Sequence, residues 1–130
     1  MPSLRSQVIR LANSNSALRP QLLPLLQREA VSVKVAGRFP LGRTVMTRSV
    51  AQDARQSPEL AMFVQECLQR HGRADWGDVK GEDRRMNDDA LKKGQEDRIL
   101  SVYKNPGGDD IWIITEWDRS ATTVMYPSDY

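Results

Sequence analysis

The feature that most constrains this chain is a series of three short β-type runs near its C-terminal end. Arg98–Tyr103 and Ile111–Trp117 flank the turn-forming residues 105–109, Asn-Pro-Gly-Gly-Asp, a composition typical of a hairpin loop. Residues 118–120, Asp-Arg-Ser, supply a second turn, and Ala121–Tyr126 forms the third run. The pattern predicts a small antiparallel β-meander.

Helical signals precede this meander. Ser57 is a capping hydroxyl, Pro58 suits a first helical position, and an acid follows in the first turn, so a helix is predicted from here to about His71, before Gly72. Its expected buried stripe is Leu60, Phe63, Val64, Cys67 and Leu68. Another helix is predicted over about Glu82–Lys93, with acids at its start and lysines at its end. Helices followed by strands predict an α+β fold, with further short strands at Val31–Val35 and Arg43–Thr47.

Residues 1–28 contain no acidic residue. Leu4, Val8 and Leu11 recur at helical spacing, and a second short helix is predicted over about Leu18–Ala30. The sequence therefore predicts two units: a basic helical N-terminal module, residues 1–30, and an α+β domain, residues 31–130. An Arg-rich, acid-poor composition is also typical of a transit peptide, so a targeting role and a docking role both stay open for the module.

The net charge of +2 hides an asymmetry along the chain. Residues 1–58 carry nine Lys or Arg residues against two acids, a net charge of +7, whereas the remainder carries ten against fifteen, a net charge of −5. The basic half could face nucleic acid, a membrane surface or an acidic partner, or pack against the acidic half of its own chain. No apolar run approaches the roughly 20 residues that a membrane span needs, so no membrane partner is expected.

Cysteine and histidine each occur once, as Cys67 and His71. A single cysteine excludes an intramolecular disulfide and fits a reducing compartment, so a cytoplasmic location is expected. Structural zinc sites usually have about four Cys or His ligands. We therefore expect no metal and no cofactor. A free strand edge in a small sheet invites pairing, so a dimer stays open.

Several groups capable of acid–base or metal chemistry cluster in one helix–loop–helix segment: His71, Asp75, Asp78, Glu82, Asp83 and Asn87. One interpretation is that they converge as a site, with His71, Asp75 and Glu82 as catalytic groups. The simpler and preferred interpretation is structural. The aspartates would then cap turns, the acids at 82 and 83 would begin a helix, and His71 would lie at a helix end that favours its cationic form.

A second polar cluster surrounds the turn at residues 116–120. Asp118 is expected to accept hydrogen bonds from backbone amides, while Arg119 is expected to pair with Glu116 or to bind a phosphate or carboxylate. Trp112 and Trp117 are five residues apart on one predicted strand, so one should be buried and the other partly exposed. The predicted binding residues are Asp75, Trp76, Asp78, Glu116, Trp117, Asp118, Arg119 and Ser120.

Several segments together resemble a family of small proteins of plasmids and integrative elements. They are FPLGRTVMT, RHGRADWGDVKGEDRRMNDDALKKG, RILSVY and IWIITEWDRSATTVMYPSDY, within about residues 38–130. The chain departs from the family pattern at Ala74, where the family tends to have Gly, and at Trp117, where it tends to have Ala. The leader also looks like openings of other mobile-element proteins. The family label of a restriction-system methylation subunit finds no support, because neither a glycine-rich cofactor loop nor an Asn/Asp-Pro-Pro-Tyr/Phe stretch is present.

These observations favour a non-enzymatic accessory protein of a mobile genetic element. It would act by binding a protein, of the host-defence or anti-restriction type, or by binding nucleic acid through its basic half. The polar cluster without a catalytic pair and the charge asymmetry along the chain together motivate this interpretation. The alternative is a small metal- or His/carboxylate-dependent hydrolase or nuclease that uses His71, Asp75 and Glu82. The spatial arrangement of those three residues distinguishes the two.

Overall fold

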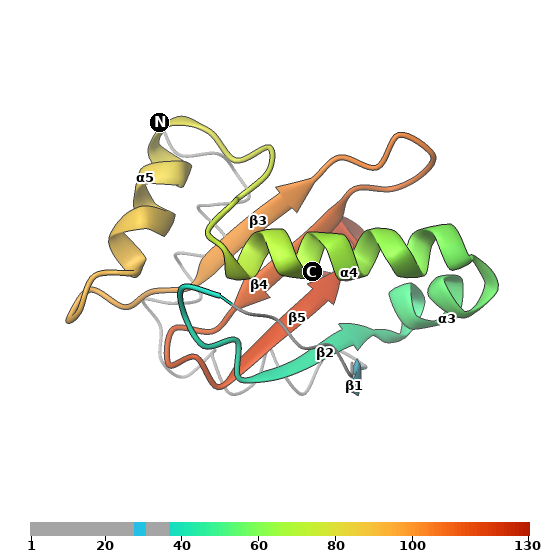
Figure 1. Ribbon diagram of the computed structural model, residues 1–130, viewed down its shortest axis with the longest axis horizontal. Coiled ribbons are helices and arrows are strands. Elements are labelled where there is room, and N and C mark those ends of the chain that lie inside the picture. Colours follow the sequence, from blue (N-terminus) through green and yellow to red (C-terminus); the bar gives the residue numbers. More distant parts are fainter. Residues whose placement is uncertain (1–27, 31–36) are drawn as a thin grey trace.

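The computed structural model describes residues 28–30 and 37–130, and it has the predicted α+β fold. In this part of the chain, helices pack with one mixed β-sheet (Figure 1). The elements, in chain order, are β1 (Arg28–Ala30), β2 (Arg43–Thr47), α3 (Arg48–Gln56), α4 (Pro58–Gly72), α5 (Gly81–Ala90), β3 (Ile99–Tyr103), β4 (Ile111–Thr115), β5 (Ala121–Met125) and the 3-10 turn η1 (Pro127–Asp129). No helix within the described ranges is long and apolar enough to cross a membrane.

The strand order of the sheet is β1-β2-β5-β4-β3. Strands β3, β4 and β5 pair antiparallel in succession, which confirms the predicted meander. Strand β2 has the predicted bounds, but it pairs parallel with β5, with Val45 opposite Thr123, so the sheet is mixed rather than purely antiparallel. A parallel pair requires a long crossover connection. Here the chain between β2 and β5 contains all three described helices and two strands of the meander.

Helix α4 begins and ends where the sequence predicts. The Ser57 hydroxyl accepts a hydrogen bond from the Leu60 backbone N–H at 3.2 Å, and Pro58 occupies the first helical position. The predicted stripe faces the core: Val64, Cys67 and Leu68 are buried, and Leu60 and Phe63 pack against the same cluster. Both signals that predict α4, its cap and its apolar spacing, are local in sequence.

Helix α3 was not predicted. It buries only Val50 and Ala51, so no apolar stripe marks it in the sequence. Its start is fixed from outside: the Thr47 hydroxyl accepts from the Val50 N–H at 3.5 Å and donates to Asp129 Oδ2 at 2.7 Å. Ser49 donates to the other oxygen of the same carboxylate at 2.8 Å. The C-terminal residues of the chain therefore hold the junction between β2 and α3.

Two predicted boundaries are corrected by the structure. The helix predicted over about Glu82–Lys93 is present as α5 but ends at Ala90. The helix predicted over about Leu18–Ala30 is wrong in its last three residues, which form β1 and pair antiparallel with β2. Strand pairing there overrides local helix propensity. The rest of that helix, the helix predicted around Leu4–Ala12 and the strand predicted at Val31–Val35 lie outside the described residues.

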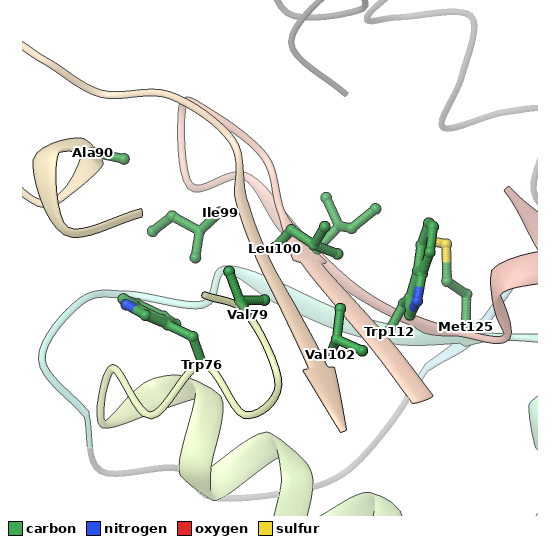
Figure 2. Packing of buried hydrophobic residues seen from close by; sticks show 9 residues of the cluster. Trp76, Val79, Ala90, Ile99, Leu100, Val102, Trp112 and Met125 are labelled. Carbon is green, nitrogen blue, oxygen red and sulfur yellow. The ribbon is translucent and has the colours of Figure 1, made fainter. Parts of the chain in front are cut away.

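The two faces of the sheet carry separate hydrophobic clusters, because successive strand side chains alternate between faces. In β4, Ile111 and Ile113 join the cluster beneath α3 and α4, whereas Trp112 and Ile114 join the opposite one. Helix α4 crosses in front of β4 and β5 in Figure 1. Figure 2 shows the second cluster, which also takes in Trp76 from the loop after α4.

The loop after α4 continues along the outer edge of β3. The Val102 N–H donates to the Trp76 carbonyl at 3.1 Å, and the Val102 carbonyl accepts from the Asp78 N–H at 2.6 Å. Gly77 lies between these contacts and forms a parallel bridge with Val102. The outer edge of β3 is therefore already paired at this point and is closed to another strand there.

We predict that Gly77→Ala destabilises the protein by roughly 2 kcal/mol, because the residue lies at a φ of +70°, a left-handed conformation that costs other residues about 1–3 kcal/mol. A Cβ there would also overlap the Val102 carbonyl oxygen. Chemical denaturation measures the change. Gly94→Ala is the matched control, because Gly94 has a φ of +82° and a Cβ added there would meet no atom within 4 Å. Equal losses in both variants would show that the close approach to β3 contributes nothing.

Candidate functional site

His71 is enclosed at the C-terminal end of α4, against the sheet. Its exposed fraction is 0%. The ring Nδ1 lies 2.6 Å from the Ser101 hydroxyl on β3, and Nε2 lies 2.7 Å from the Thr115 hydroxyl on β4. Phe39 and Trp76 pack against the ring edge-on, at centroid distances of 5.4 and 5.8 Å. Both ring nitrogens are thus bonded to hydroxyls inside the fold.

The direction of these hydrogen bonds can be assigned from the last acceptor backward. The Leu41 carbonyl can only accept, so the Thr122 hydroxyl donates to it at 2.7 Å. Thr122 therefore accepts from the Thr115 hydroxyl, also at 2.7 Å. Thr115 in turn accepts from Nε2–H of His71, and Nδ1 accepts from the Ser101 hydroxyl. This order assigns the neutral Nε2–H tautomer to His71.

Burial fixes the same charge state. It is the main cause that lowers the pKa of His71 to about 3, and the positive charge of Arg119 lowers it further. The prediction that His71 is cationic is therefore wrong. Exclusion of water disfavours the charged ring more than the C-terminal end of the helix favours it. A protonated ring would also have to donate at Nδ1, which disrupts the order of the hydrogen bonds. The His71 chain, meaning Ser101, His71, Thr115 and Thr122, is a structural polar network.

The carboxylates of the helix–loop–helix segment have other partners. Asp75 is exposed and accepts from Arg70 Nε at 2.8 Å, and this hydrogen bond is the main cause that lowers the pKa of Asp75. Asp75 also accepts from the Gly77 N–H at 3.2 Å, the predicted turn-capping role. Glu82 is exposed in the first turn of α5. No group of three or more His, Cys, Asp or Glu residues that could hold a metal occurs among the residues the structure describes.

Asn87 and Trp76 are buried residues that tie this segment to the sheet. Asn87 Nδ2 donates to the Leu100 carbonyl at 2.7 Å, and its Oδ1 accepts from the Leu100 N–H at 3.2 Å. The indole N–H of Trp76 donates to Asp88 at 2.9 Å, while the residue is only 2% exposed. Trp76 is thus a core residue, although it was predicted to be a binding residue. Asp78 lies at the surface, 3.7 Å from Lys80.

The turn at residues 116–120 begins with a buried ion pair. Arg98 Nε donates to Glu116 Oε1 at 3.0 Å, and the two side chains are 1% and 7% exposed. Arg98 also donates to the Tyr130 hydroxyl at 2.9 Å. The predicted binding residue Glu116 therefore lies inside the fold, where it positions the start of the turn.

Arg119 is held by backbone carbonyls. Its Nη1 donates to the carbonyls of Asp97, Glu116 and Trp117 at 2.8–3.2 Å, and its Nη2 donates to the Ala90 carbonyl at 2.6 Å. The last contact places a cation at the C-terminal end of α5, where the helix dipole favours it. Arg119 was expected to use the Glu116 carboxylate or an external anion, but its contact with Glu116 is through the backbone. Burial lowers its pKa.

The outer residues of the turn are exposed. Trp117 is 39% exposed and Trp112 only 6%, which confirms that one of the two tryptophans is buried and the other partly exposed. The reason differs in part, because β4 ends at Thr115 and Trp117 lies in the turn itself. Asp118 accepts from the Ser120 N–H at 3.0 Å, which confirms the predicted capping role. Trp117, Asp118 and Ser120 form the surface that we call the tip.

Four important residues were given no role from the sequence: Arg98, Ser101, Thr115 and Thr122. The last three are hydroxyl residues on strands whose residues are all buried. Hydroxyl groups on buried strands need hydrogen-bond partners inside the fold. Their presence in these strands could therefore have predicted a buried polar side chain nearby, such as that of His71. Arg98 and Glu116 are adjacent to the ends of β3 and β4, so their pairing was implied once β3 and β4 were placed in register.

Comparison with family models, with curated proteins and with solved structures found no significant match to this chain. The resemblance to plasmid and integrative-element proteins, which rests on the segments quoted above, therefore stays a prediction.

Proposed function

We propose that this protein is a non-enzymatic accessory protein of a mobile genetic element, and that it acts by binding another protein at the tip. The mobile-element part rests on the sequence resemblance. The binding part rests on one observation: an indole, that of Trp117, is presented at the surface by a turn held through buried contacts. Tryptophan is among the side chains that most often dominate binding energy at protein interfaces.

The support beneath the tip matters for affinity. Arg119 has a φ of +60°, which is uncommon outside glycine, and its four hydrogen bonds to carbonyls stabilise that conformation. A turn that is already ordered loses less conformational entropy when a partner binds. Trp117 stands where the resembling family tends to have Ala, so the contact would be specific to this chain. A host-defence protein, of the kind that anti-restriction proteins bind, is the partner class that we propose.

The hydrolase or nuclease alternative requires an accessible acid–base group. His71 is sealed and bonded to two hydroxyls, whereas Asp75 and Glu82 are exposed at the surface, outside this enclosure. A general base must reach the proton that it removes. This geometry gives the alternative no supporting observation among the described residues, so we do not propose it.

We predict that Trp117→Ala abolishes recovery of a stoichiometric protein partner from host lysate, with binding weakened about 30-fold, as expected for an interface hot spot. The intact protein, Trp117→Ala and Trp117→Phe would be used as baits at equal concentration. Trp117→Phe keeps an aromatic ring and should retain most of the partner. Arg119→Ala is unsuitable, because it removes the support of the turn.

Two results would contradict the proposal. One is recovery of the same partner at the same level by Trp117→Ala. The other is recovery of nucleic acid alone, released by salt, which would indicate that the basic N-terminal half is the binding surface. Gln52→Ala is the control, since Gln52 is an exposed residue on α3, away from the tip (Figure 1).

A further inference from the structure

A groove runs along the outer side of α4 at the opposite end of β4 from the tip. Two hollows of about 480 and 500 Å³ adjoin there, because both are lined by Glu59 and Phe63. The first hollow extends to the β3–β4 loop and to Tyr126, and the second extends along α4 past Met62. Figure 1 shows the start of α4 beside α3, with the β3–β4 loop at the same end of the sheet. We call this surface the α4 groove.

The α4 groove has an apolar floor. Leu60 and Phe63 are half-buried and pack on the core, and they also line the first hollow. Met62 is 71% exposed and lines the second. Met62 and Trp117 are the two exposed large hydrophobic residues among those described. Most of the Met62 side chain therefore lies outside the packing of α4 against the sheet.

The rim of the groove is acidic. Among the described residues that line the two hollows, the charged ones are Asp53, Glu59, Glu66 and Asp109. Asp53 accepts a hydrogen bond from the Tyr126 hydroxyl at 2.6 Å, which anchors one carboxylate at the rim. Four carboxylates among the lining residues favour a negative potential in the groove. That potential repels nucleic acid and favours a cationic partner.

We infer that the α4 groove is a second protein-docking site, which binds a cationic amphipathic segment of a partner protein. The apolar side chains of that segment would pack on Met62 and Phe63, and its Lys or Arg side chains would pair with the carboxylates of the rim. Glu59, Met62 and Glu66 follow a spacing of three and four residues, so they form one face of α4. A segment lying along this face can therefore contact an apolar residue flanked by two acids.

The test uses the full-length protein and a synthetic helical peptide with leucines on one face and lysines on the other. We expect Glu59→Gln combined with Glu66→Gln to weaken peptide binding about tenfold at low salt, because two exposed ion pairs are lost. Met62→Ser should weaken it by a similar factor. Glu82→Gln combined with Glu96→Gln is the matched control, since it removes the same charge from exposed positions outside the groove and should leave binding unchanged.

Two further probes separate the groove from general electrostatic attraction and from the tip. A peptide with every leucine replaced by serine should bind much more weakly, and Trp117→Ala should bind the original peptide normally. Equal weakening by the control pair, full binding of the serine peptide, or loss of binding in Trp117→Ala would each overturn the inference. Binding in the α4 groove does not depend on binding at the tip. A negative result for one of these two proposals therefore does not contradict the other.

Discussion

The free energy of unfolding is expected to fall by about 1.4 kcal/mol per pH unit as the pH drops below roughly 6.5, because His71 is held neutral. In the unfolded chain a histidine has a pKa near 6.5, whereas in the folded protein the pKa of His71 is lowered to about 3. The unfolded state therefore binds one more proton between these two values. Stability that is fully present above pH 6.5 is lost progressively as the pH falls toward about 3.

This dependence can be measured by urea unfolding between about pH 5 and pH 6.5, above the range in which ordinary carboxylates titrate. His71 is the only histidine in the sequence, so the slope has one source. His71→Gln is the control, because glutamine can donate and accept but does not titrate. That variant should lose overall stability and lose the slope. A slope that persists in His71→Gln, or a flat profile in the unaltered protein, would contradict the assigned neutral state.

Arg98→Met is expected to destabilise the protein by roughly 3–5 kcal/mol, because it removes the cation that lies 3.0 Å from the buried Glu116 carboxylate. The two side chains are 1% and 7% exposed and 3.0 Å apart, so water does not replace the lost partner. The Tyr130 hydroxyl loses a donor in the same change. Chemical denaturation at neutral pH measures the loss.

The double variant Arg98→Met, Glu116→Gln should recover a large part of that stability, since it leaves no buried charge unpaired. Lys92→Met is the matched surface control. It breaks the Lys92–Asp89 pair, which has a similar distance of 2.9 Å but side chains that are 62% and 43% exposed. Exposed pairs contribute only about 0–1 kcal/mol. A loss of that small size in Arg98→Met would show that Arg98–Glu116 behaves as a surface pair.

Sequence reasoning succeeded where the determining contacts are close together along the chain. Helix α4 is specified by Ser57, Pro58 and a regular apolar stripe, and the meander by two turns between β-branched runs. It failed for α3, whose start depends on Asp129, 82 residues away from Thr47. It failed in the same way for Arg28–Ala30, where pairing with β2 decides the conformation. These contacts join residues that are far apart in the sequence, so no local sequence pattern predicts them.

The candidate site was predicted in part for the same reason. The turn at 116–120 and the roles of Asp75 and Asp118 were visible, because capping acts within two or three residues. Burial was not visible: Trp76 and Glu116 are enclosed by elements far away in sequence. The neutral state of His71 depends on Ser101, Thr115 and Thr122, which come from three different strands. A histidine at a helix end gives no local sign of such partners.

The backbone contacts of Trp76 and Asp78 with Val102 have a consequence for behaviour at high concentration. When that loop detaches, Val102 offers an unsatisfied amide and carbonyl to any extended chain nearby, and Trp76 leaves the hydrophobic cluster that it shares with the sheet. Another molecule could then add a strand at this position, and its own loop would be displaced in turn. The loop therefore covers this edge of the sheet and prevents a further strand from adding to it. Substitutions that weaken the contact between this loop and β3, such as Gly77→Ala, should reduce solubility during storage well before they reduce the folded fraction of a dilute sample.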